Sequence, residues 1–210
     1  MRKALAAMIL LAATPAAADW QGFYAGAHVG YGFSGNIGSS GWLNNWDRTP
    51  RGVIGGLQVG YDWQFGRFVL GVTGDANLSS IGRFRRSDPA LIGLVTNMSE
   101  RARLNYSASI RARVGFLPVD RLLLYVTGGP VVAQTMRTWL LDLGVRTDGE
   151  TRTATQYGGT VGLGAEAMIT DKISATIEWR YTALRPYLFG PDDSFSFQGQ
   201  DVRLGVNYRF

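Results

Sequence analysis

Hydrophobic and polar residues alternate over long stretches of this chain. The clearest stretch is 101–116, RARLNYSASIRARVGF, in which apolar residues take every second position and Arg, Asn, Ser and Gly take the positions between them. A repeat of two residues predicts a β-strand whose two faces differ in polarity. The alternation predicts eight strands, at 22–33, 52–64, 68–78, 101–116, 122–136, 151–169, 173–181 and 202–210.

The phase of one strand is ambiguous, because 122–136 is apolar on both faces. We group Leu122, Leu124, Val126 and Val132 on one face, and the sequence leaves open which way this face points.

The predicted connections alternate in length. Three are tight, at 65–67, 117–121 and 170–172. Four are long and rich in Gly, Asn, Asp, Ser and Pro, at 34–51, 79–100, 137–150 and 182–197. Antiparallel strands then carry all the short connections at one end of the sheet and all the long ones at the other. Short periplasmic turns and long extracellular loops are typical of an outer-membrane β-barrel.

The first residues predict export. Arg2 and Lys3 precede an apolar run that ends in Ala16-Ala17-Ala18, and this order is typical of a secretory signal peptide. We expect 1–18 to be the signal peptide and 19–210 to be a single β-barrel domain.

Alternation alone does not say which face lies inside, since a secreted lipocalin is also an eight-stranded barrel with its apolar face inward. Here the polar faces combine small residues with Arg, Asp and Glu, which suits the filled interior of a small barrel. Aromatic residues also gather near both ends of the apolar faces, as the interfacial girdles of a membrane barrel do. They are Phe23, Trp63, Phe68, Phe116, Tyr208 and Phe210 at the turn side, and Tyr31, Phe33, Tyr106, Tyr157, Trp179 and Tyr181 towards the loops.

The charged residues indicate an ion-paired interior. Of 21 basic residues only Lys3 and Lys172 are lysines, and arginine is the residue suited to enclosed ion pairs. Unpaired charges in an enclosed site are very costly, so these side chains must neutralise one another. The predicted interior network contains Asp62, Asp75, Arg101, Arg103, Arg111, Arg113, Glu166, Glu178, Arg180, Asp201 and Arg203.

The order and spacing of several segments resemble the small OmpA-like outer-membrane β-barrel proteins, and most closely their alphaproteobacterial surface-antigen and porin-family group. The segments are WQGFYAGAHVGYGF at 20–33, GGLQVGYDWQFGRFVLGVTGDANLS at 55–79, SIRARVGF at 109–116, LLLYVTGGPV at 122–131, GLGAEAMI at 162–169 and the final VRLGVNYRF. Thr73 stands where the family pattern has an acidic residue, so that position is not transferred.

The resemblance implies a surface protein of the Gram-negative outer membrane that supports envelope integrity. It also implies that the terminal aromatic Phe210, with Tyr208 two residues before it, is the signal read by the barrel-assembly machinery. A girdle role alone is the simpler alternative for Phe210.

Enzyme and nucleic-acid functions are disfavoured. The chain has one histidine and no cysteine, which excludes a His/Cys metal cluster and a cysteine nucleophile. A net charge of +5 is too small and too scattered for a nucleic-acid footprint. We expect no cofactor.

The loops leave two alternative functions open, a surface receptor for hemin or a host ligand and a small porin-like channel. Arg83, Arg85 and Arg86 are candidate lipopolysaccharide contacts, although a solvated basic loop has the same composition. Loop aromatics that could grip a ligand are Trp42, Trp46, Trp139, Tyr187 and Phe189.

Overall fold

A computed structural model of the chain describes residues 19–39, 50–87, 97–142, 147–190 and 193–210. The expected signal peptide, 1–18, lies outside these ranges. Within the described ranges, no helix has the length and apolar character needed to cross a membrane.

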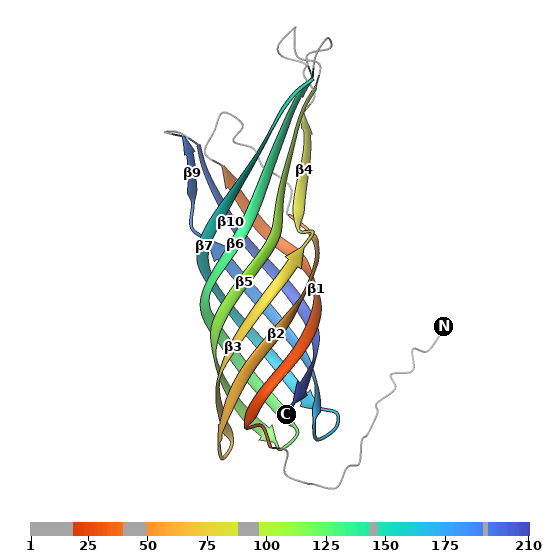
Figure 1. The fold of residues 1–210 in the computed structure, drawn as a ribbon, viewed down its shortest axis with the longest axis vertical. Coiled ribbons are helices and arrows are strands. Elements are labelled where there is room, and N and C mark those ends of the chain that lie inside the picture. Colours follow the sequence, from red (N-terminus) through yellow and green to blue (C-terminus); the bar gives the residue numbers. More distant parts are fainter. Residues whose placement is uncertain (1–18, 40–49, 88–96, 143–146, 191–192) are drawn as a thin grey trace, which may run out of the picture.

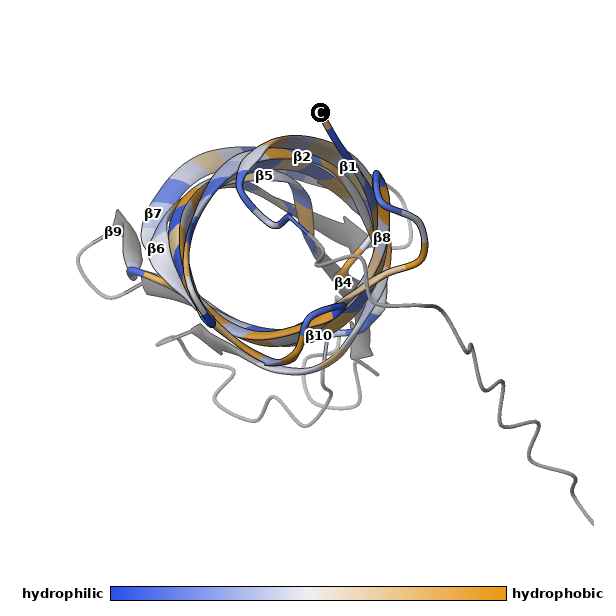
Figure 2. Cartoon of the chain, turned by 90° about the horizontal axis from the view of Figure 1, so that it is seen from below, coloured by the Kyte–Doolittle hydropathy of each residue, from blue (hydrophilic) through white to orange (hydrophobic). Residues whose placement is uncertain are grey.

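The described residues form one antiparallel sheet that closes on itself (Figures 1 and 2). Its strands are β1 (Gly22–Ser39), β2 (Gly52–Phe65), β3 (Phe68–Ser79), β4 (Gly82–Ser87), β5 (Asn97–Val119), β6 (Leu122–Asp142), β7 (Thr147–Met168), β8 (Ile173–Leu184), β9 (Tyr187–Gly190) and β10 (Asp193–Arg209). Eight of them form the ring in the order β1-β2-β3-β5-β6-β7-β8-β10, and β1 pairs with β10 to complete it. The predicted eight-stranded antiparallel barrel is therefore confirmed.

The alternation of the sequence becomes the two faces of the barrel wall. Asp75 and Asn77 are buried, whereas their outward neighbours Ala76 and Leu78 are exposed. Both girdles face outwards, and aromatic pairs such as Phe23 with Tyr61 and Phe68 with Phe116 pack ring against ring at the turn side. The structure decides the facing of β6, which the sequence left open: Leu124 and Val126 are exposed on the outer wall, while Leu123 and Tyr125 are buried.

The turns and the loops differ as expected in length, but the strands extend further into the loops than predicted. Gly66, with a positive φ of 61°, and Arg67 are the two residues that join β2 to β3. At the other end β6 continues to Asp142 and β7 begins at Thr147. A membrane barrel needs only about 9–11 residues per strand. Because β5, β6 and β7 have 23, 21 and 22 residues, they rise well beyond the barrel body (Figure 1).

One β-bulge reverses the predicted facing of part of β5. The register between β5 and β6 shifts between Leu104 and Tyr106, so one extra residue enters β5 there. A shift by one residue moves each side chain to the opposite face. Leu104 is therefore buried and Arg103 is exposed, which corrects the prediction that Arg103 belongs to the interior network.

Candidate functional site: the ion-paired interior

Four charged side chains near the turns form a first ionic layer, which we call the turn-side cluster: Asp62, Arg113, Glu166 and Arg209. They come from β2, β5, β7 and β10. Arg113 pairs with Asp62 at 3.2 Å and also with Glu166. Arg209 pairs with the same two carboxylates, at 2.8 and 3.1 Å. Two guanidinium groups and two carboxylates thus neutralise one another inside the barrel.

Neutral groups complete this cluster. Ser174 donates to Glu166 Oε1 at 2.5 Å, and the Asn207 amide donates to the same oxygen at 3.1 Å. These contacts occupy acceptor positions that the arginines leave free, as a buried carboxylate requires.

Aromatic rings cover the turn-side cluster. The Arg113 guanidinium lies 4.0 Å from the centre of the Tyr125 ring, and that of Arg209 lies 4.7 Å from the Trp20 ring. Both distances are within the range of cation–π attraction. Inward glycines make room for the tyrosines, because a Cβ atom at Gly164 would overlap the ring of Tyr125.

Trp20 closes the turn end of the lumen. Its side chain is fully buried, its indole N–H donates to the Asp120 carbonyl at 2.8 Å, and its own carbonyl accepts from Arg209 at 2.8 Å. It packs in a turn-side apolar layer that consists of Trp20, Val69, Leu117, Leu123, Tyr125 and Met168. The segment before the first strand therefore fills the barrel's end rather than leaving it open.

A second ionic layer lies nearer the loops. This loop-side cluster consists of Asp75, Arg111, Glu178, Arg180, Asp201 and Arg203. Arg111 bridges Asp75 at 3.2 Å and Glu178 at 2.5 Å. Arg180 bridges the same two carboxylates at 3.0 and 3.2 Å.

The third arginine of this cluster, Arg203, joins charged and neutral groups. It pairs with Asp201 at 2.5 Å and lies 3.8 Å from Asp75. It also donates to the Asn77 side-chain oxygen at 2.7 Å and lies 3.1 Å from His28 Nε2. The single histidine is thus a packed member of the polar interior.

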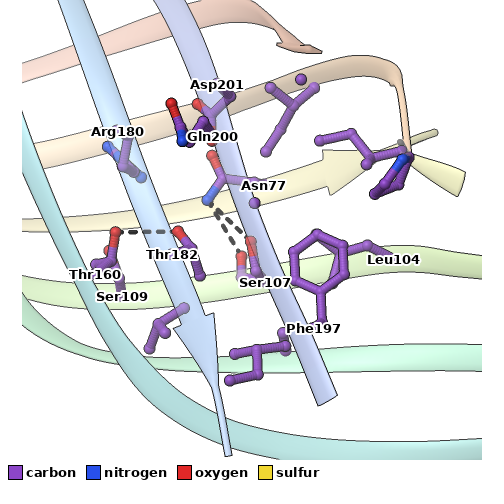
Figure 3. Close-up of a pocket in the computed structure, with 18 of the residues that line it drawn as sticks. Asn77, Leu104, Ser107, Ser109, Thr160, Arg180, Thr182, Phe197, Gln200 and Asp201 are labelled. Carbon is purple, nitrogen blue, oxygen red and sulfur yellow. Dashed lines mark hydrogen bonds between the residues drawn. The ribbon is translucent and has the colours of Figure 1, made fainter. Parts of the chain in front are cut away.

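A loop-side apolar layer covers this second cluster. It consists of Ile54, Ile81, Leu104, Val131, Ala133, Leu184 and Phe197. A cavity of about 30 Å³ lies between the loop-side apolar layer and the loop-side cluster (Figure 3). Asn77, Arg180 and Asp201 line its polar side, and Leu104 and Phe197 its apolar side. Such a space holds on the order of two water molecules.

The lumen is filled over the length of these four layers. Along β5 they appear in order as Leu117, Arg113, Arg111 and Leu104. A cavity of only about 10 Å³ separates the two ionic clusters, and it is lined by Tyr24, Arg111 and Glu178 among others. That volume is about the minimum for a single water molecule.

The structure brings together most of the predicted network. Asp62, Asp75, Arg111, Arg113, Glu166, Glu178, Arg180, Asp201 and Arg203 are all buried and ion-paired. Arg103 is exposed because of the bulge in β5, and the side chain of Arg101 lies outside the described part of the chain.

Sequence reasoning missed two members of the interior. Arg209 stands in the inward register of the last strand, two residues after Asn207, so the alternation could have identified it. Trp20 precedes the first strand and carries no periodic signal. Its place follows only from its contacts with Asp120 and Arg209.

The candidate surface residues are placed less completely. Arg83, Arg85 and Arg86 belong to β4, whose backbone pairs with β5 at Ala102, Glu100 and Ser99, and their side chains lie outside the described part. The same holds for the side chains of the loop aromatics Trp139, Tyr187 and Phe189, while Trp42 and Trp46 lie outside the described residues altogether. Tyr208 and Phe210 are exposed on the outer wall, with ring centres 5.1 Å apart in an edge-to-face arrangement.

Among the described residues, no group of three His, Cys, Asp or Glu side chains is arranged to hold a metal ion. The interior carboxylates are instead engaged by arginines, hydroxyls and amides. In this arrangement the interior carboxylates and guanidinium groups neutralise one another's charge inside the barrel.

Comparison with known proteins identifies relatives over nearly the whole chain. A 22 kDa outer membrane protein of Rhizobium leguminosarum bv. viciae is 32% identical over 197 residues, which cover 92% of this chain and 80% of the relative. A 31 kDa outer-membrane immunogenic protein of Brucella melitensis biotype 1 is 30% identical over 210 residues, which cover 91% of this chain and 84% of the relative.

Solved structures include similar chains at low identity. Ail, the attachment invasion locus protein of Yersinia pestis, aligns over 90% of this chain and 100% of its own, with a TM-score of 0.46 and 17% identity. Neisserial surface protein A aligns over 90% of this chain and 98% of its own, with a TM-score of 0.47 and 15% identity.

The family model for the outer membrane protein beta-barrel domain matches residues 4–210. This protein therefore belongs to the outer membrane protein beta-barrel domain family and is an integral protein of the bacterial outer membrane.

Proposed function

We propose that the protein is a structural, surface-exposed barrel that supports the integrity of the outer membrane and does not conduct. One observation carries this proposal: the lumen is filled by two neutral ionic clusters between two apolar layers. The cavities beside the clusters are about 30 and 10 Å³ in volume. Neither has room for a hydrated ion to pass without displacing paired side chains, and breaking such pairs is costly.

The long strands support surface exposure. β5, β6 and β7 extend well past the length that a membrane requires, so their loop ends stand outside it. Between the turns and these loop ends, the outer wall is mainly apolar and carries aromatic girdles, which suits lipid contact.

Electrical recording tests the filled lumen. Purified, folded protein in planar bilayers should show no stable, large, porin-like openings. Correct folding is checked first by the shift in gel mobility between unboiled and boiled samples, which a closed barrel should show. Reproducible large openings from folded protein would exclude this proposal and favour the channel alternative.

A genetic test addresses envelope integrity. A strain without the protein should become more sensitive to detergent and to large hydrophilic antibiotics, and the parent gene should restore resistance. Unchanged sensitivity in the deletion strain would contradict the structural role.

In the parent strain, mass spectrometry of the mature protein should find Asp19 as its first residue, as expected from cleavage after Ala18.

A further inference from the structure

One hollow lies on the outside of the barrel. It is a groove of about 420 Å³ on the wall formed by β2, β3, β5, β6 and β7. Its floor contains Ala76 and Ala108, which pair across β3 and β5. Larger residues border this floor, among them Leu57, Leu78 and Tyr106. Small residues between large ones thus leave a trough on a surface that faces lipid.

Two arginines lie on the loop side of this groove, outside its lining. Arg103 stands three residues before Tyr106 on β5, and Arg51 stands six residues before Leu57, just ahead of β2. Gly82 exchanges backbone hydrogen bonds with Arg51, at 3.3 and 3.4 Å, and pairs with Arg103 on its other side. Neighbouring strands are about 4.8 Å apart, so the Cα atoms of the two arginines are separated by roughly 10 Å. The residue between them has no side chain. Both arginines are exposed, and Arg103 faces outwards because of the bulge that follows it.

The position of these arginines matches that of a lipid headgroup. Arg103 lies on β5 just beyond Tyr106, the girdle aromatic that borders the groove, and therefore at the loop-side interface of the membrane. Among the described residues, neither Arg51 nor Arg103 forms an ion pair with a carboxylate. No described carboxylate competes for their guanidinium groups, and guanidinium matches the geometry of phosphate.

We propose that the groove and the Arg51–Arg103 pair form one binding site for the lipid A part of lipopolysaccharide. An acyl chain lies in the groove over Ala76 and Ala108, and a phosphate lies between the two guanidinium groups. The loop side faces the outer leaflet, where this lipid resides. The site uses the outer wall alone, so it stands independently of the filled lumen on which the structural function rests.

Titration of the folded protein in detergent, followed by native mass spectrometry, tests the site. The parent should bind diphosphorylated lipid A more tightly than dephosphorylated lipid A, phosphatidylglycerol or inorganic phosphate. Arg51→Gln/Arg103→Gln should weaken lipid A binding by about tenfold or more, because charge-assisted hydrogen bonds are lost. Ala108→Leu should weaken it comparably by filling the groove.

Matched controls separate this site from general lipid contact. Arg185→Gln removes an exposed arginine directly after β8, and Ala27→Leu enlarges an exposed alanine on β1. Both should bind like the parent, and each variant is first shown to fold by its gel shift. Equal binding of phosphatidylglycerol, or equal losses in the controls, would overturn the assignment to lipid A. Unchanged binding in Ala108→Leu would remove the groove from the site.

Discussion

The two halves of the lumen use the same residue types in different surroundings. In the turn half, Arg113 and Arg209 share Asp62 and Glu166 beneath the rings of Trp20 and Tyr125. In the loop half, the cluster around Asp75 and Arg203 borders a cavity that has room for water. A buried charge that loses its partner can be hydrated only where water can reach it. The comparison therefore predicts that equal truncations cost more in the turn half.

The largest effect is expected for Arg113→Ala. It leaves Asp62 and Glu166 with one arginine between them and removes the cation from the Tyr125 ring. Removal of one partner from a buried ion pair costs about 3–5 kcal/mol. Urea unfolding in detergent, followed by tryptophan fluorescence and the gel shift, measures this loss.

An exposed ion pair provides the control for that variant. Arg121 and Asp171 pair at 2.8 Å in the turns, with Asp171 largely exposed. Arg121→Ala should cost less than about 1 kcal/mol, as exposed pairs do. Equal costs for Arg113→Ala and Arg121→Ala would contradict the role assigned to the turn-side cluster.

The next effect concerns the apolar layer of the turn half. Trp20→Ala removes a fully buried ring and should destabilise the barrel by about 3 kcal/mol. Trp20→Phe keeps most of the apolar volume but loses the hydrogen bond to Asp120, so it should cost only about 1 kcal/mol. If Trp20→Ala unfolds at the urea concentration of the parent, the segment before β1 does not stabilise the barrel.

A smaller loss is expected for Arg203→Ala in the loop half. Its partners are Asp201, Asn77 and His28, and Asp201 borders the cavity of about 30 Å³. Water can enter the space left by the side chain, so we expect a loss of about 1–3 kcal/mol, the cost of imperfectly satisfied polar groups. A loss equal to that of Arg113→Ala would show that hydration does not distinguish the two halves.

The smallest effect on stability is expected on the outer wall of the turn half. Phe210 is exposed to the membrane, and its ring contacts the Tyr208 ring edge-to-face at 5.1 Å. Deletion should cost about 1 kcal/mol in detergent. If Phe210 is also the assembly signal, the deleted protein should fail to reach the outer membrane in cells.

Substitutions at the same position refine this test. Phe210→Tyr and Phe210→Trp should restore surface levels, because an aromatic remains, whereas Phe210→Ser should not. Normal surface levels for both the deletion and the serine variant would show that Phe210 is a lipid-facing side chain only.

The sequence by itself determined the class of protein and the facing of most side chains. A period of two predicts a strand and assigns each residue to one of two faces, and the eight repeats with alternating turns predicted the closed barrel. The same period is sufficient to place Asp62, Arg113 and Glu166 on the inner face.

Only the tertiary structure decided which charges meet. The period assigns a face but not a height or a position around the ring, and both depend on how the tilted strands are staggered at closure. Arg209 reaches Asp62 across 147 residues because β10 closes against β1. The facing of Arg103 depended on a bulge, which adds a residue without changing the pattern of the sequence. Trp20 occupies the lumen because closure leaves an apolar end that must be covered.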